Sequence, residues 1–140
     1  GYAGCASLAE GRAFELRPPE PVDLLRAASR WNIAGQGPLA LRYLRRATEG
    51  QEEPNAAVLE LEAQARFLIG EEDRARGLLR RSLEMQPRSN ETLLGAARQF
   101  LARGRPELAG LYADVAPDGD SGAEWSSLRE QIRRAGGTTD

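Results

Sequence analysis

The sequence predicts an all-α protein made of three helix–turn–helix repeats followed by a closing helix. Small and apolar residues recur at intervals of three and four, which is the spacing of one face of an α-helix. A glycine that suits a left-handed helix cap occurs once in each repeat, at Gly35, Gly70 and Gly104. These glycines are separated by 35 and 34 residues, and a period of this length is typical of helical repeat proteins.

The same offsets relate apolar positions on the first helix of each repeat. An offset of 34 residues pairs Leu59 with Leu93 and Ala63 with Ala97. An offset of 35 residues pairs Ala28 with Ala63, which indicates an earlier copy upstream. The predicted repeats cover residues 21–55, 56–89 and 90–120, within a repeat domain of residues 21–120.

Prolines mark where the predicted helices begin and end. Pro38 and Pro106 fall in the first turn of a second helix, where a missing N–H costs no hydrogen bond. Pro54, Pro87 and Pro117 follow the second helices and end them. The helices expected from these signals span residues 22–34, 38–49, 55–69, 72–85, 90–103 and 106–116.

A closing helix is expected at residues 121–135, within a terminal region of residues 121–136. Ser121 and Glu124 form a capping-box pattern at its start. One narrow apolar stripe follows, made of Trp125, Leu128, Ile132 and Ala135. A helix with one apolar face suits the open end of a repeat array, which needs a terminal element with a polar outer side. The alternative is a helix that docks into a partner.

The composition excludes several functional classes. With 41% hydrophobic and 29% charged residues, the chain has the balance of a folded domain rather than a disordered one. A net charge of −2 without a long basic run disfavours nucleic-acid binding. All 19 basic residues are arginine, so the usual general base and the Schiff-base lysine are both missing. One cysteine and no histidine leave no zinc site. We therefore expect no enzyme, no cofactor and no metal site.

A helix–turn–helix unit of 34 residues with small residues at fixed places resembles the tetratricopeptide repeat family. The matching positions are the small eighth residue, the alanine at the twentieth and the proline at the thirty-second. They are Ala28, Ala63 and Ala97, then Ala40, Ala75 and Ala109, and finally Pro87. The chain lacks the family's Trp at the fourth position and Tyr at the eleventh. The resemblance covers residues 21–120 and implies a right-handed α-solenoid that binds other proteins.

The resemblance also implies that the first helix of each repeat lines a concave groove. Its inward positions are Leu25, Ser29 and Asn32 in the first repeat, Glu60, Gln64 and Phe67 in the second, and Glu91, Leu94, Arg98 and Leu101 in the third. This mixed surface suits an extended segment or a helix of a partner protein. Phe67 and Leu101 are equally compatible with the core. The basic clamp by which related domains capture chaperone C-termini is absent, because Leu25 and Ser29 occupy its positions.

Residues 1–20 do not fit the repeat, and we expect them to form an extended tether. Ala3, Gly4 and Cys5 precede small residues and a proline-rich link, a layout that resembles the mature start of a bacterial lipoprotein. The resemblance implies lipidation of Cys5, and Ala6 after it implies sorting to the outer membrane. The alternative is a chance solitary cysteine.

Two functions are compatible with this layout. The first is an interaction scaffold at the periplasmic face of the outer membrane that aids assembly of a pilus or secretion machine. Small lipoproteins of the pilotin-like and tight-adherence types are similar in layout. The alternative is a soluble cytoplasmic chaperone or adaptor for a secreted or assembling protein. The lipidation of Cys5 distinguishes the two, and the sequence leaves the oligomeric state open.

Overall fold

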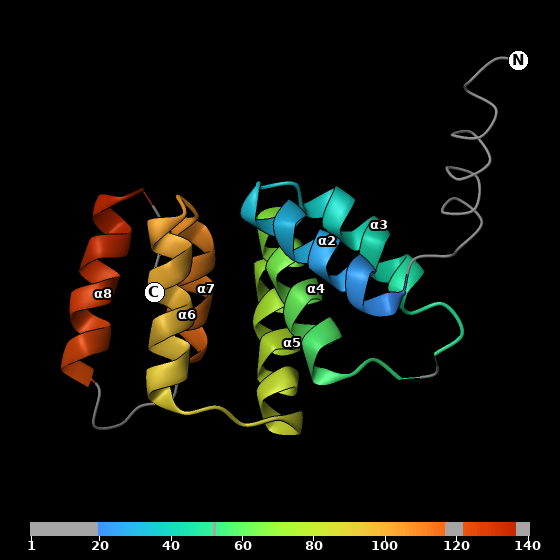
Figure 1. Cartoon of the computed structure of the whole chain (residues 1–140). Coiled ribbons are helices and arrows are strands. Elements are labelled where there is room, and N and C mark those ends of the chain that lie inside the picture. The colour runs from blue at the N-terminus through green and yellow to red at the C-terminus, as the bar shows by residue number, and fades with distance from the viewer. Residues whose placement is uncertain (1–19, 52, 117–121, 137–140) are drawn as a thin grey trace, which may run out of the picture.

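The computed structural model describes residues 20–51, 53–116 and 122–136, which form helices and turns without any strand (Figure 1). The predicted all-α class is therefore confirmed. The helices are α2 (Pro21–Ile33), α3 (Gly37–Ala47), α4 (Ala56–Leu68), α5 (Glu72–Met85), α6 (Asn90–Ala102), α7 (Pro106–Val115) and α8 (Gly122–Arg134). Each expected helix is present, and no boundary differs from the prediction by more than two residues. The tether with Cys5, Pro117 and the capping residue Ser121 lie outside the described residues.

The helix ends follow from local chemistry. The three repeat glycines adopt positive φ, for example 94° at Gly70 between α4 and α5, as a left-handed cap requires. The Asn55 side chain accepts a hydrogen bond from the Val58 amide at the start of α4. The Ser89 hydroxyl does the same for the Thr92 amide at the start of α6. These signals define three antiparallel helix pairs: α2 with α3, α4 with α5, and α6 with α7.

The first two pairs pack through small residues. Helix α4 lies against both α2 and α3, and their contact buries Ala28, Ala40 and Ala65 completely. Gly37 marks the closest approach, since a Cβ atom there would lie 2.8 Å from the carbonyl oxygen of Ala65. In Figure 1, α2 and α3 lie across the axes of α4 and α5 rather than along them. Small side chains at the crossing permit this short distance between the helices.

The third pair packs in the reverse order. Repetition of the first contact would place α6 against α4 and α5, but α7 makes that contact instead. The cause lies in α7, which is buried on every side. Its buried residues are Leu108, Ala109, Gly110, Leu111, Tyr112 and Ala113. A helix that is apolar all round belongs in the interior. Helix α6 keeps Glu91, Arg98 and Gln99 exposed and lies further out. The first helices therefore do not stack alike throughout the array.

Helix α8 covers the free side of this C-terminal part. It packs on α7 and, to a smaller extent, on α6. Its apolar stripe is buried at Trp125, Leu128 and Ile132, whereas Ala135 follows the helix and is exposed. The larger hydrophobic core therefore runs through α4 to α8, and a smaller one joins α2, α3 and α4. Among the helices described, none combines the length and apolar composition needed to cross a membrane.

Candidate protein-binding groove

A groove opens between α2 and α6, with α4 and α7 as its floor. It encloses a cavity of about 280 Å³. Its lining combines hydrogen-bonding groups with apolar surface. The residues are Ser29 and Ile33 on α2, Glu60 and Gln64 on α4, Ala96, Gln99, Phe100 and Arg103 at α6, and Tyr112 on α7. Residues of all three helix pairs therefore line the groove.

A chain of hydrogen bonds fixes the floor of the groove. The Asn32 side-chain amide donates to the Gln64 amide oxygen at 3.1 Å, and the Gln64 amide donates to the Tyr112 hydroxyl at 3.0 Å. The Tyr112 hydroxyl then donates to the Glu60 carboxylate. Arg88, in the link between α5 and α6, donates to the same carboxylate at 2.7 Å. The chain joins α2, α4 and α7, so it specifies how the helix pairs dock.

The protonation states of this chain are set by burial and by the Glu60 charge. Burial, followed by the charge of Glu60 and the hydrogen bond to it, raises the pKa of the Tyr112 hydroxyl far above its ordinary value. Burial alone would lower the pKa of Arg88, but the hydrogen bond and the charge of Glu60 raise it. Tyr112 is therefore a hydrogen-bond donor and Arg88 is cationic at physiological pH. The Asn32 Oδ1 atom, at the other end of the chain, is buried without a partner in the part of the protein that is described.

Arg105 joins one end of the groove to the third helix pair. Its Nε donates to the Ile33 carbonyl oxygen at 2.7 Å, at the C-terminus of α2. A cation at this place also interacts favourably with the dipole of α2. The guanidinium is held in turn by Glu107, at 3.1 Å. The distance between α2 and the turn from α6 to α7 is therefore fixed by a direct contact.

Some of the predicted groove residues of α2 and α4 line the cavity, and the others are buried beneath it or in the hydrophobic cores. Ser29, Glu60 and Gln64 line the cavity. Asn32 is buried beneath them, and Leu25 packs against the smaller core. Phe67 is only 6% exposed and lies in the larger core, where the Arg76 guanidinium carbon is 5.9 Å from the centre of its ring.

The predicted groove residues of α6 point away from the cavity. Leu94 is 1% exposed in the core, and Leu101 packs against that core. Arg98 forms an ion pair with Glu124 of α8 at 3.5 Å, and Glu91 is exposed without lining the cavity.

The face of α6 that lines the groove lies about half a turn from the predicted one, at about 100° per residue. It carries Ala96, Gln99, Phe100 and Arg103 instead. This rotation follows from the reversed packing of the third pair, which turns the expected inner face of α6 toward α7 and α8. The apolar composition of α7 is the sequence signal that would have revealed it.

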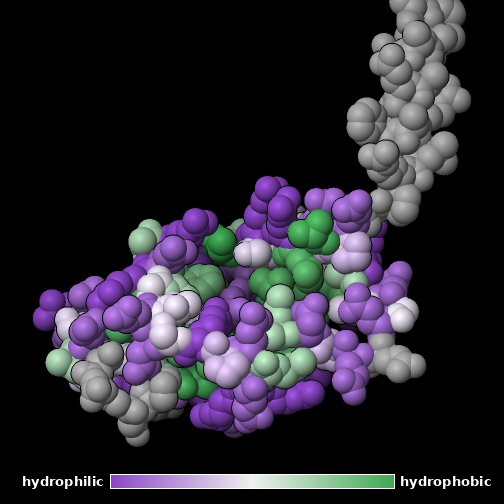
Figure 2. All heavy atoms as spheres, turned by 60° about the horizontal axis from the view of Figure 1, so that its bottom comes forward, coloured by the Kyte–Doolittle hydropathy of each residue, from purple (hydrophilic) through white to green (hydrophobic). Residues whose placement is uncertain are grey.

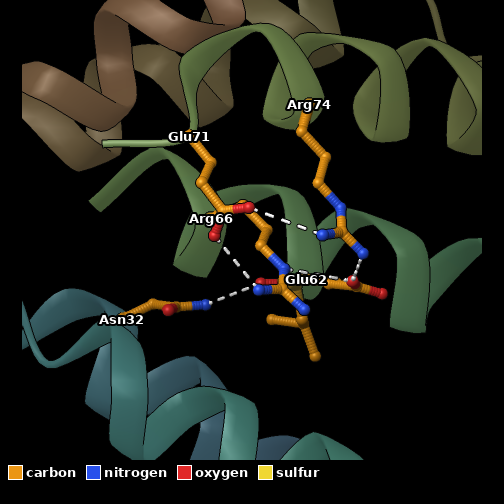
Figure 3. Close-up of polar contacts among 6 residues, drawn as sticks. Asn32, Glu62, Arg66, Glu71 and Arg74 are labelled. Atoms are coloured by element: carbon orange, nitrogen blue, oxygen red, sulfur yellow. Dashed lines mark hydrogen bonds and ion pairs between the residues drawn. The ribbon is translucent and has the colours of Figure 1, made fainter. Parts of the chain in front are cut away.

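A ring of ion pairs clasps the hairpin of α4 and α5 on the side of α4 opposite the groove (Figure 3). Arg66 contacts Glu62 at 3.3 Å and Glu71 at 3.1 Å. Arg74 contacts the same two carboxylates at 3.8 and 3.4 Å. Two arginines and two glutamates leave no net charge, so this cluster has a structural role and is a poor site for an ion.

A second cavity of about 290 Å³ lies on the described surface where α5, α6 and α7 meet, lined by Arg80, Leu83, Glu84, Pro87, Arg88, Leu93 and Val115. It lacks the buried hydrogen-bond chain of the groove. Within residues 20–51, 53–116 and 122–136, no three His, Cys, Asp or Glu side chains gather as metal ligands would. On the face shown in Figure 2, hydrophilic residues predominate and hydrophobic ones reach the surface in separate patches.

Comparison of the chain with protein-family models gives no match, and comparisons with curated proteins and with solved structures give none either. The functional argument therefore depends on the geometry of the chain itself.

Proposed function

We propose that this protein binds a segment of a partner protein in the groove between α2 and α6. The observation that carries the proposal is the cavity itself, which is preformed over a buried hydrogen-bond chain. Its volume of about 280 Å³ suits one or two side chains of a bound peptide. Small-molecule sites are commonly larger, at roughly 300–1,000 Å³. Ser29 and Gln99 on opposite walls offer hydrogen bonds to a peptide backbone.

The chemistry of the groove favours binding over catalysis. Tyr112 is held protonated and already donates to Glu60, so it is a poor nucleophile. The Glu60 carboxylate is engaged by both Tyr112 and Arg88, so it is a poor general base. The sequence contains no histidine that could take either role. We therefore propose an interaction protein without enzymatic activity.

The proposal includes a finer assignment of the fold. We propose a short solenoid of tetratricopeptide-like repeats in which the last pair is reversed and α8 closes the end. The recurring small residues at the helix contacts, such as Ala28, Ala40 and Ala75, support it. The matching offsets of the three helix pairs support it as well.

The groove is tested by photo-cross-linking in cells. A photoreactive amino acid replaces Gln99 on the groove wall, and a matched variant carries it at Arg42, which is exposed on α3. We expect a discrete cross-linked product from position 99 that disappears when Ala96→Trp fills the cavity. Equal products from both positions, or a product that survives Ala96→Trp in a folded variant, would contradict binding in the groove.

For the cellular role we propose an outer-membrane lipoprotein that aids assembly of a pilus or secretion machine. Its support is the sequence around Cys5, which lies outside the described residues. The test is the mass of the protein made from its complete gene in a Gram-negative host, beside a Cys5→Ala variant. A lipid mass increment that the variant lacks would support a membrane-anchored scaffold. An unmodified product would favour the cytoplasmic chaperone or adaptor.

A further inference from the structure

Two arginines at the walls of the groove have no acidic partner among the residues that the structure describes. Arg103 lines the cavity at the C-terminal end of α6, where it is exposed. Arg30 lies on α2 next to Ser29 and three residues before Ile33, so it shares the face of α2 that borders the cavity. Among the residues that the structure describes, neither guanidinium forms an ion pair, although nine other arginines do. These two cations are free to meet a ligand.

The residues on the floor of the groove do not neutralise the positive charge of its walls. Glu60 is the carboxylate that lines the cavity, and the Arg88 guanidinium lies 2.7 Å from it. The floor pair is therefore neutral, and Arg30 and Arg103 leave the groove positive. The whole chain is nevertheless negative, with a formal charge of −2. A cationic groove on an anionic protein indicates a ligand of negative charge, because complementary potentials steer and orient binding partners.

The groove also presents apolar surface between these cations. Ile33 on α2 and Phe100 on α6 line the cavity from opposite walls, and Ala96 leaves room between them. Phe100 is held in place by Tyr112, whose ring centre lies 5.5 Å away. An apolar side chain can therefore enter the cavity while its charged neighbours stay at the rim.

From these contacts we infer that the groove selects an acidic segment of a partner protein. One apolar side chain enters between Ile33 and Phe100, and flanking Asp or Glu residues pair with Arg30 and Arg103. This inference rests on the proposed protein-binding function and specifies the class of segment that is bound.

A nucleic acid fits the same groove less well. Single strands bind through exposed aromatic platforms and a continuous basic track. Here Tyr112 is 1% exposed and Phe100 is half-buried, and of the described arginines two, Arg30 and Arg103, border the cavity without an ion pair. An acidic peptide needs no more than these two charges and one apolar pocket.

The test is selection of peptides from a random library of about twelve residues displayed on phage, with the folded full chain as bait. Peptides are scored as groove binders when Ala96→Trp abolishes their capture, and circular dichroism melting checks that this variant folds. We expect groove binders to be rich in Asp and Glu around one apolar residue. For a selected peptide, Arg103→Glu weakens binding about ten-fold at low salt, as expected for loss and reversal of one charge pair.

A charge-swapped bait makes the test specific. Selection on the Arg30→Glu/Arg103→Glu variant is expected to yield basic peptides instead. The matched control is Arg42→Glu/Arg46→Glu, which changes the net charge equally on the exposed side of α3 and leaves the acidic preference intact.

The outcomes separate the inference from the function on which it rests. Groove binders that are neutral or basic on the original bait would overturn the acidic preference while leaving peptide binding in place. A library without any groove-dependent peptide would count against both. Tighter binding of an oligothymidylate of twelve nucleotides than of the selected peptides would overturn the inference in favour of nucleic acid.

Discussion

The N-terminal and C-terminal parts of this protein use the same repeat spacing for two different packings. In the N-terminal part, α4 rests on α2 and α3, as expected for a regular stack. In the C-terminal part, α7 takes the place expected for α6, and α6 and α8 surround it. The spacing of helices and turns is shared, so it does not determine the packing. The packing is determined by the side chains on the outer face of each second helix.

Equivalent positions on the second helices show this directly. The repeat offsets relate Arg42 on α3 and Gly77 on α5 to Leu111 on α7. They likewise relate Leu39 and Arg74 to Leu108. Arg42 and Arg74 are exposed, whereas both leucines of α7 are 0% exposed. A charged outer face keeps α3 and α5 at the surface, and an apolar one takes α7 into the core.

The largest expected effect is that of Leu111→Arg, which gives α7 the outer residue of α3. An unpaired guanidinium would be buried, and we expect a loss of at least about 4 kcal/mol in the free energy of unfolding. Urea denaturation followed by circular dichroism measures it. The reciprocal change, Arg42→Leu, should stay within about 0.5 kcal/mol of the original protein. Comparable losses from both variants would remove the contrast between the two helices.

Tyr112→Phe tests the hydrogen-bond chain that joins the two parts. The variant leaves the buried Gln64 amide without an acceptor and removes a donor from Glu60, so we expect a loss of about 2–3 kcal/mol. Tyr43 occupies the equivalent place on α3, is half-buried and makes no hydrogen bond through its hydroxyl to a described residue. Tyr43→Phe should therefore be nearly neutral in the same denaturation experiment, and a loss equal to that of Tyr112→Phe would argue against the chain.

Gly37→Ala tests the close contact within the N-terminal part. The new Cβ would lie 2.8 Å from both the Ala65 carbonyl oxygen and the Ile69 Cγ2 atom. We expect a loss of about 1–3 kcal/mol, as for other overpacked contacts. Gly77→Ala is the control, because nothing lies within 4 Å of its added Cβ in the middle of α5. That variant should gain about 0.5–1 kcal/mol from helix propensity.

The smallest expected effect is the change in the free energy of unfolding at alkaline pH. The pKa of Tyr112 is raised in the folded protein, so its contribution is complete below the ordinary value of 10.0 and declines as the pH rises above it. In the unfolded chain the hydroxyl loses its proton, which favours unfolding by about 1.4 kcal/mol per pH unit. That slope is reached only well above pH 10, so between pH 10 and 11 the original protein should lose about 1 kcal/mol more stability than Tyr112→Phe. Parallel pH profiles would contradict a buried, protonated hydroxyl.

The helices were predictable from the sequence because their signals are local. Gly70, Pro106 and the Asn55 cap act within one or two turns, and the expected boundaries agree with the structure to within two residues. The groove was predictable only where the stack is regular. Ser29, Glu60 and Gln64 line the cavity as the repeat register implies.

The groove wall of α6 was not predictable from the same register. Its orientation depends on the burial of Leu108 and Leu111, a competition between whole helices that no single repeat encodes. Gln99 and Arg103 line the groove because α7 displaces α6 from α4. Tyr112 enters the site for the same reason. The repeat spacing does not reveal these placements. A comparison of the outer faces of the second helices would have identified the groove wall of α6 and the place of Tyr112.

The most direct test of the reversed third pair is a nuclear Overhauser spectrum of the full chain. The account predicts cross-peaks between the Tyr112 ring protons and the Gln64 side-chain amide, because that amide donates to the Tyr112 hydroxyl at 3.0 Å. It also predicts cross-peaks between Arg98 and α8, where Glu124 lies 3.5 Å away. Cross-peaks that join Arg98 to Gln64, with none from Tyr112, would show a regular stack and contradict the account.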